Sequence, residues 1–319
     1  MLTRRFLVAA GLTLPAGMAR AAWPERPITW VVPFGAGSVT DGSSRIVAQR
    51  MSELLGQPIV VQNRPGASGT IGAEMVARAA PDGYTVLYGT VGTHAVQPVL
   101  NPELRYDPVR DFQPLHGLGA SPNLLVVPVN QPWQSMADLV AYARSHPDKL
   151  TYASSGIGTS LHLCAEMLAA ETGIRTVHVP YVNGTQALTD LMAGRIDYMF
   201  DFPVTAMPHV KSGRLRALAV TDVARVAAAP DVPTTAEAGF PRVQLTSWAA
   251  LFAPANTPAP IAGRLAEACA AALRDPKVVD YYRNAGTALW ADVDAERMKQ
   301  LVVTDRERIS RLLQGTNKG

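Results

Sequence analysis

Residues 28–41 read ITWVVPFGAGSVTD, and this run decides the fold. Its first five residues, Ile28–Val32, are all β-branched or aromatic and predict a buried strand. The proline and glycines of 33–37 end the strand, and an amphipathic segment from about Asp41 to Leu55 predicts a helix. A strand that passes through a glycine-rich turn into a helix is the first half of a βαβ unit, so we expect parallel strands.

The pattern continues outward along the chain in two series. The first series completes a βαβαβ unit. The second series repeats the same alternation of strands and helices, and a final strand and three helical segments follow it. This order indicates an α/β protein with mostly parallel sheets flanked by helices. The expected strands are 28–32, 59–62, 85–88, 124–128, 150–153, 177–179, 198–200, 215–220 and 244–252, and the expected helices are 41–55, 71–79, 136–144, 160–172, 185–193, 258–274, one from Pro276 and 295–313.

Two series of strands predict two lobes. We expect the chain to cross into the second lobe near Ser121 and Pro122 and to return near 242–248, so that the C-terminal helices cover the first sheet. Lobe one is then residues 22–121 with 243–319, and lobe two is residues 122–242. Two crossings make a hinge, and a cleft between lobes is the expected ligand site.

The N-terminal segment predicts export. Arg4 and Arg5 precede the apolar run Phe6–Leu14, and Ala19-Arg20-Ala21 is a small-x-small cleavage pattern, so we expect a signal peptide cleaved after about Ala21. The arginine pair leaves both the general secretory and the twin-arginine route open. The apolar run is shorter than the ~20 residues of a membrane span, and the expected location is the periplasm.

Charge and cysteine usage exclude other classes. The net charge of +3 falls when the leader's arginines are removed, and no basic stripe remains, so we expect no nucleic-acid partner. Cys164 and Cys269 lie far apart in apolar helical patterns, which favours buried thiols over a disulfide. The expected mature protein is a soluble monomer.

Two glycine-rich loops carry the candidate chemistry. The loop at 33–41 connects a strand to a helix start, where backbone N–H groups lack internal partners and can bind an anion. The alternative is an ordinary helix start capped by Thr40 or Asp41. The loop SSGIGTS at 154–160 has the same design in the second lobe. Two such helix starts, one on each side of a cleft, can hold a carboxylate without an arginine. The first loop lacks the third glycine of a dinucleotide fingerprint and the lysine of a P-loop.

Other polar residues follow the strands of the predicted sheets. Tyr181 fits either a cleft wall or a core, and Asp201 either orients a ligand or water or caps the next helix. His162 and Glu166 share a helix face, but no third metal ligand accompanies them, so we expect His162 to donate to the second loop or the ligand. Arg64 is expected to pin its loop. No Ser-His-Asp arrangement or nucleophile elbow is recognisable, so we expect neither an enzyme nor a cofactor.

Several longer motifs together carry a family resemblance. They are WPERPI at 23–28, PF with its glycine loop at 33–41, VQNRPGASG at 61–69, APDGYT at 80–85, SSGIGT at 154–159, HVPY at 178–181 and APANTP at 253–258. With these motifs the chain resembles the Bug-type periplasmic solute-binding receptors of tripartite tricarboxylate transporters. The resemblance implies a type II periplasmic binding protein fold and a carboxylate held by backbone amides of the two loops.

The resemblance also implies the site and the partner. The family's first loop commonly carries a second glycine where this chain has Ser38, so the role of Ser38 is open. The implied function is capture of a mono-, di- or tricarboxylate, aromatic acids among them, and its delivery to a membrane transporter of the tripartite tricarboxylate type. The alternative is presentation of the bound ligand to a membrane sensor histidine kinase. The expected ligand-binding residues are Phe34, Gly35, Ala36, Gly37, Ser38, Thr40, Asp41, Thr90, Ser154, Ser155, Gly156, Gly158, Thr159, Ser160, His162, Tyr181 and Asp201.

Overall fold

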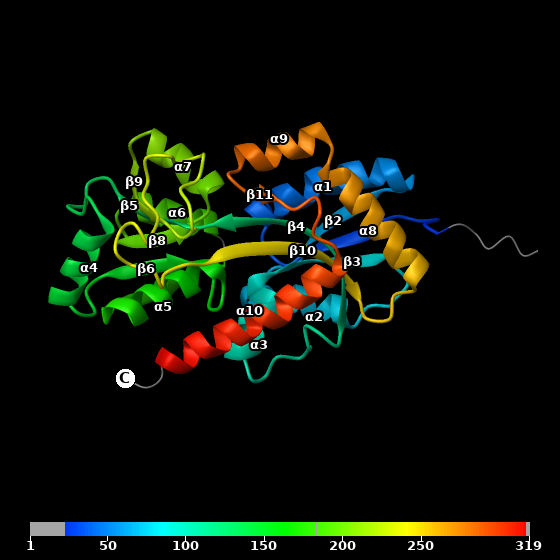
Figure 1. The fold of residues 1–319 in the computed structure, drawn as a ribbon, viewed down its shortest axis with the longest axis horizontal. Helices are drawn as coiled ribbons and strands as arrows, with labels where there is room; N and C mark the ends of the chain where they lie inside the picture. The colour runs from blue at the N-terminus through cyan, green and yellow to red at the C-terminus, as the bar shows by residue number, and fades with distance from the viewer. Residues whose placement is uncertain (1–22, 183, 317–319) are drawn as a thin grey trace, which may run out of the picture.

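The computed structural model describes residues 23–182 and 184–316, so the expected signal peptide lies outside the described residues. The chain forms two mixed β-sheets, each covered by helices, and the two sheets lie end to end along the long axis of the molecule (Figure 1). Because strands and helices alternate through both parts, the α/β class predicted from the sequence is confirmed.

The six-stranded sheet has the order β11-β4-β10-β3-β1-β2. The first three strands are parallel, as the βαβαβ pattern predicts. The sheet becomes mixed because β10 pairs antiparallel with both β3 and β4, and β11 pairs antiparallel with β4. The strands are β1 (Ile28–Val32), β2 (Ile59–Asn63), β3 (Thr85–Thr90), β4 (Phe112–Pro122), β10 (Thr246–Pro254) and β11 (Ala288–Leu289).

The five-stranded sheet has the order β7-β6-β8-β5-β9. Strand β6 runs parallel to β7 and β8, whereas β5 runs antiparallel to β8 and β9. All of its strands come from one stretch of chain. They are β5 (Leu124–Pro128), β6 (Thr151–Ser154), β7 (Val177–Pro180), β8 (Tyr198–Asp201) and β9 (Leu215–Val220).

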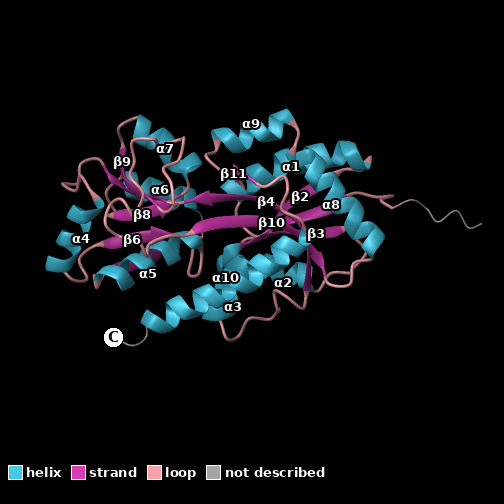
Figure 2. Ribbon diagram, viewed as in Figure 1, coloured by secondary structure: helices cyan, strands magenta, loops and turns pink. Residues whose placement is uncertain are grey.

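Helices cover both sheets (Figure 2). Helix α8 packs on α1 and β4, and α10 packs on β4, so the C-terminal helices cover the six-stranded sheet. Helix α10 also reaches α5. The helices are α1 (Val39–Leu55), α2 (Thr70–Ala77), α3 (Gln97–Leu100), α4 (Met136–Ser145), α5 (Ser160–Thr172), α6 (Gly184–Met192), α7 (Pro203–Lys211), α8 (Ala259–Leu273), α9 (Pro276–Asn284) and α10 (Ala295–Thr316), with a 3₁₀ turn at Ala67–Gly69 and a π-helical turn at Gly92–Val96.

The chain passes between the sheets twice, and the two passages are tied together. Asn123 separates β4 from β5, and its N–H donates to Thr221 Oγ1 at 2.9 Å. Thr221 N in turn donates to Asn123 O, and Thr221 Oγ1 donates to Leu245 O at 2.7 Å, just before β10 begins. All three residues are buried. The two connections between the sheets therefore lie side by side.

Candidate functional site

A cavity of about 370 Å³ lies between the two sheets and draws its walls from both. Loops at the carboxyl ends of β1, β3, β6 and β8 contribute to it, as expected for a ligand site in an α/β protein. The cavity therefore gathers residues from loops that are far apart in the sequence. Of the residues predicted from the sequence, the cavity is lined by Phe34, Gly35, Gly37, Ser38, Thr40, Thr90, Ser155, Thr159, Ser160 and Asp201.

The other predicted residues stand behind or beside the cavity wall. None of them lines the cavity itself. They are Ala36, Asp41, Ser154, Gly156, Gly158, His162 and Tyr181. Tyr181 is neither a wall of the cavity nor a fully buried core residue. Its side chain is partly buried against the core, and its hydroxyl donates to Asp190 Oδ2 at 2.8 Å.

The start of helix α1 presents free backbone donors to the cavity. The helix begins two residues earlier than the sequence pattern predicts, because Ser38, and not Thr40 or Asp41, is its N-cap. The Ser38 hydroxyl accepts from Asp41 N and pairs with Thr40 Oγ1 at 2.9 Å. The N–H groups of Val39 and Thr40 have no hydrogen-bond partner among the described residues, and both residues line the cavity.

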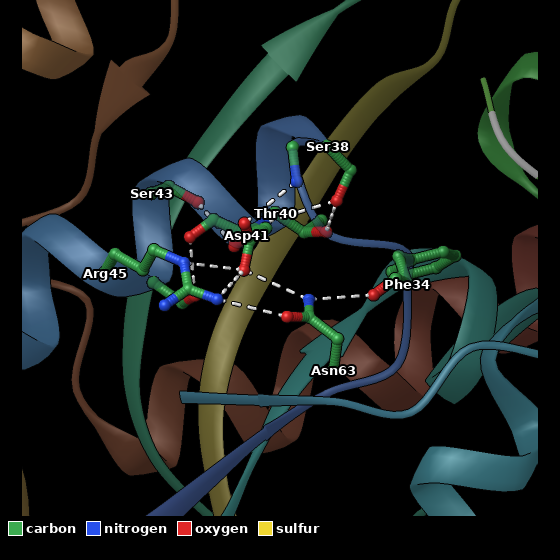
Figure 3. Close-up of polar contacts among 9 residues, drawn as sticks. Phe34, Ser38, Thr40, Asp41, Ser43, Arg45 and Asn63 are labelled. Carbon is green, nitrogen blue, oxygen red and sulfur yellow. Dashed lines mark hydrogen bonds and ion pairs between the residues drawn. The ribbon is translucent and has the colours of Figure 1, made fainter. Parts of the chain in front are cut away.

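Asp41 holds this loop in shape from behind (Figure 3). Its Oδ2 accepts from Gly37 N at 2.9 Å, and its Oδ1 accepts from Arg45 Nε and Asn63 Nδ2, each at 3.0 Å. Asn63 Nδ2 also donates to Phe34 O at 3.0 Å. Burial pushes the pKa of Asp41 up, but these hydrogen bonds outweigh burial and hold it below its usual range. The carboxylate therefore fixes both ends of the glycine turn.

The pin of the neighbouring loop was predicted to be Arg64, and this prediction is wrong. Arg64 is exposed, and its side chain makes no hydrogen bond to the described residues. Arg45 takes that role from helix α1, since its guanidinium contacts the Asp41 carboxylate and donates to the side-chain oxygen Oδ1 of Asn63 at 3.2 Å. The sequence places Arg45 four residues after Asp41, a spacing that could have indicated the pair.

The start of helix α5 repeats the design of α1 on the other side of the cavity. Thr159 is its N-cap, and its hydroxyl accepts from His162 N. The N–H groups of Ser160 and Leu161 have no partner among the described residues, and both residues line the cavity. His162 does not donate to the loop as predicted: its Nδ1 accepts from Gly158 N at 3.3 Å.

A cluster of aromatic and polar side chains supports the α5 loop. Ser154 Oγ lies 2.7 Å from His178 Nε2, and Tyr152 stacks on His178 with ring centroids 4.7 Å apart. Burial lowers the pKa of His178 to about 4 and also lowers that of His162, so both imidazoles are neutral at pH 7. The serine–histidine contact was not predicted from the sequence. Neither residue lines the cavity, and Ser154 Oγ also hydrogen-bonds Gly156.

Asp201 contributes a buried carboxylate to the cavity. It accepts from Phe202 N and from Thr205 Oγ1, each at 2.8 Å, at the start of α7. It has no ion-pair partner among the described residues, and burial raises its pKa to about 6. Asp201 therefore lines the cavity and hydrogen-bonds to the first residues of α7, but it is not the cap of that helix, because the N-cap is Phe202 and no side chain caps it.

Aromatic side chains outside the predicted set of ligand-binding residues complete the wall. Tyr88 comes from β3, Trp248 from β10, and Tyr281 and Tyr282 from α9. The indole N–H of Trp248 donates to Asp305 on α10 at 2.7 Å. The signal for the two tyrosines was weak, because adjacent aromatic residues in a short C-terminal helix are typical of a core. Gly42 on α1 leaves room for the Tyr281 hydroxyl, which a Cβ at that position would meet.

The described residues were also compared with the requirements of a metal site, a disulfide and a membrane-spanning helix. Within residues 23–182 and 184–316, no cluster of three histidine, cysteine or acidic side chains is arranged to hold a metal ion. Cys164 and Cys269 are both buried and free. None of the described helices has both the length and the apolar character needed to cross a membrane.

Known proteins of one family are similar to this chain in sequence and in fold. A family model described as the tripartite tricarboxylate transporter family receptor matches residues 43–318. The periplasmic binding protein BugD is 32% identical, with a TM-score of 0.88 over 92% of this chain and 99% of BugD. MatC from Rhodopseudomonas palustris, solved with bound malate, is 35% identical, with a TM-score of 0.87 over 91% of this chain and 100% of MatC. Rpa4515 from R. palustris, solved with adipate, is 36% identical, with a TM-score of 0.88 over 92% and 98%. These matches confirm the resemblance and the fold expected from the sequence.

Proposed function

The chain belongs to the receptors of the tripartite tricarboxylate transporter family, and we propose that it captures a small carboxylate between its two sheets and delivers it to a membrane transporter of that type. The ligand is bound and released without chemical conversion. The N-terminal pattern of basic residues, apolar run and cleavage site supports export to the periplasm. The relatives solved with malate and adipate support a carboxylate as the ligand.

One observation carries this proposal. The cavity is lined by the first two residues of two helices, one beside each sheet, and the backbone N–H groups of Val39, Thr40, Ser160 and Leu161 lack partners among the described residues. Ser160 and Leu161 are buried and Val39 and Thr40 are half-buried, and the first N–H groups of a helix have no partner within the helix, so these four donors are available to the acceptor oxygens of a ligand in the cavity. The helix dipoles favour a negative charge at the same place.

We further propose that the two sheets belong to two lobes that close on the ligand, with boundaries at 22–121 plus 243–319 and at 122–242. The paired connections at Asn123 and Leu245 are the candidate hinge. On the far side of the cavity, Gln97 Nε2 donates to Ile157 O at 2.6 Å, and a Cβ on Gly156 would lie 2.5 Å from Ser68 Oγ. These contacts join the lobes only when they are closed.

A thermal-shift screen of the mature protein tests the proposal. The panel is a set of mono-, di- and tricarboxylates, each beside its neutral amide. A ligand at 100 times its Kd stabilises the folded state by about 2.7 kcal/mol, so we expect a rise in Tm of roughly 5 °C for the right carboxylate and none for its amide. If no carboxylate raises the Tm after co-purified ligand has been removed, or if the amides act equally, the proposal is wrong.

Removing the contact between the lobes is expected to shorten ligand residence. Gln97 is 6% exposed, and replacing it by alanine deletes the hydrogen bond to Ile157 O. A neutral hydrogen bond contributes ~0.5–1.5 kcal/mol, so we expect the Gln97→Ala variant to release ligand about two- to tenfold faster in stopped-flow measurements. Gln134→Ala is the matched control, because the Gln134 side chain is exposed and its hydrogen bond, to Pro132 O, lies two residues away in the chain. Equal release rates for the unaltered protein, Gln97→Ala and Gln134→Ala would show that the Gln97 hydrogen bond does not slow ligand release.

A further inference from the structure

The Asp201 carboxylate lies beside the loop that begins helix α5. Strands β6 and β8 run parallel, with Ala153 opposite Met199, so the residues that follow the two strands leave the same edge of the sheet side by side. Asp201 is the last residue of β8, Ser155 and Ser160 follow β6, and all three residues line the cavity. A ligand carboxylate that reaches the Ser160 N–H therefore enters the same cavity as the Asp201 carboxylate.

No positive charge offsets the Asp201 carboxylate. Its residue is 6% exposed, and no charged neighbour among the described residues contributes to its pKa. Of the residues that the structure describes, no lysine or arginine lines the cavity. His209 does line it, but Arg214 donates to His209 Nδ1 at 2.6 Å, and burial and then this cation lower the pKa of His209. The start of α7 favours an ionised Asp201, yet burial outweighs it and raises the pKa of Asp201 to about 6.

The hydrogen bonds around Asp201 fit the protonated acid. Thr205 Oγ1 lies 2.8 Å from Asp201 Oδ2 and 2.9 Å from Phe202 O. A hydroxyl carries one hydrogen, so it can donate to only one of these oxygens while Asp201 is ionised. If Oδ2 carries a proton, Asp201 donates to Thr205 Oγ1, and the Thr205 hydroxyl donates to Phe202 O. The protonated form therefore satisfies both contacts of the Thr205 hydroxyl, and the ionised form satisfies one.

Burial keeps the other titratable groups around the cavity from changing charge near pH 7. Strands β5 and β6, which flank β8, carry no histidine, lysine, arginine or carboxylate. Glu166 on α5 accepts from the Tyr152 hydroxyl at 2.6 Å and does not line the cavity. Burial lowers the pKa values of the nearby histidines and raises those of the nearby tyrosines. These groups are His162, His178, His209, Tyr88, Tyr281 and Tyr282.

Given the proposed function, on which this inference rests, we propose that the receptor binds its carboxylate ligand together with one proton, and that Asp201 holds this proton. An ionised Asp201 and the ligand's charge repel each other in a cavity without cations. Two charges ~10 Å apart, at an effective dielectric constant of about 20, change the binding constant of a proton about tenfold. The proton comes from the solvent and moves onto Asp201 Oδ2. By linkage, the ligand binds more tightly where the protonated form is already populated.

Isothermal titration of the mature chain tests this inference. The probes are malate, adipate, benzoate and hexanoate, and the tightest binder of the four is used. The enthalpies measured at pH 7 in HEPES and in Tris, which differ in ionisation enthalpy, give the number of protons taken up. We expect about 0.4 proton or more per ligand, and a Kd that rises about fivefold or more from pH 6 to pH 8, because free Asp201 loses its proton above its pKa of about 6.

Two variants assign the proton to Asp201. In Asp201→Asn the amide can donate to Thr205 as the neutral acid does, so we expect no proton uptake and a Kd that does not change between pH 6 and pH 8. Thr205→Val keeps Asp201 but removes a donor to its carboxylate, so the pH at which affinity falls is expected to move upward. Asp231→Asn is the control, because Asp231 is exposed and does not line the cavity, and both the uptake and the pH profile should persist.

The contrary outcomes are distinct from failure of the proposed function. Binding by the unaltered protein without proton uptake, at a Kd that is constant from pH 6 to pH 8, would overturn the inference while carboxylate capture stands. So would proton uptake that persists in Asp201→Asn but is lost in His209→Gln. If Asp201→Asn did not fold, an unchanged pH profile in Thr205→Val would overturn the inference. If neither the four probes nor any other member of the carboxylate panel binds, the proposed function fails and the inference fails with it.

Discussion

Replacing Val39 and Ser160 together by proline is expected to weaken carboxylate binding by at least two orders of magnitude while leaving the fold intact. Each residue is the first of its helix, where proline is well tolerated, and each substitution removes one free N–H from the cavity. A hydrogen bond to a charged group is worth ~1.5–3 kcal/mol, so the two losses together amount to roughly 3–6 kcal/mol. Isothermal titration with the tightest-binding carboxylate measures the effect.

The backbone before each position already suits proline. The residue before a proline favours extended conformations, and Ser38 (ψ 164°) and Thr159 (ψ 162°) have them. Val39→Ala with Ser160→Ala is the control, because it shortens the same side chains and keeps both N–H groups. Each single proline variant is expected to lose about tenfold or more, and the Tm without ligand should match that of the alanine control. Equal Kd values for the proline and alanine variants would exclude these N–H groups as the anion site.

Replacing Asp41 by alanine is expected to lower both stability and affinity, although Asp41 does not line the cavity. The substitution removes the acceptor of Gly37 N and of Arg45 Nε, and one of the two acceptors of Asn63 Nδ2. Losing a buried acceptor of several donors costs about 2–4 kcal/mol of unfolding free energy, measurable by denaturant titration. The freed glycine turn no longer holds the Val39 and Thr40 donors in place, so we expect the Kd for carboxylate to rise at least tenfold.

The pH dependence of the Asp41 variant provides a second test. The folded-state pKa of Asp41 is below its ordinary value of 3.8, so its contribution to stability is present at pH 7 and is lost as pH falls below about 4. The difference in unfolding free energy between the unaltered protein and Asp41→Ala should therefore become smaller as the pH falls below about 4. Glu53→Ala is the control, since Glu53 is an exposed partner of Arg50 on the same helix, worth at most ~1 kcal/mol. If Asp41→Ala lowered the free energy of unfolding at pH 7 no more than Glu53→Ala does, the role given to Asp41 would be contradicted.

Sequence periodicity predicted most elements of the fold, and the misses have a physical cause. The strand at 124–128 and the helix at 160–172 match the structure end to end. Strand β4 was missed because it contains Pro114, Gly117 and Gly119, which resemble a loop. Tertiary packing explains the glycines: a Cβ on Gly117 would lie 2.9 Å from Val293, and one on Gly119 would lie 2.6 Å from the Ala288 carbonyl.

The candidate site was predicted where it depends on local chain geometry. The two glycine loops end parallel strands and begin helices, so their place at the cavity follows from the strand–turn–helix pattern. The wall from α9 could not be predicted, because Tyr281 and Tyr282 reach the cavity through the packing of a distant C-terminal helix on α1. The same holds for Gln97, whose partner Ile157 lies in the loop between β6 and α5, beside the other sheet.

Strand β10 lies between β3 and β4, although the entire five-stranded sheet separates β4 from β10 in the chain. The two strands that pair with β4 are β10 and the two-residue β11, and both follow the five-stranded sheet in the chain, whereas residues 124–220 contain every strand of that sheet. Pairing across a long separation is slow, and local pairing is fast. We therefore expect residues 124–220 to assemble early, and the cavity, which draws its walls from both sheets, to form late, when β10 pairs between β3 and β4.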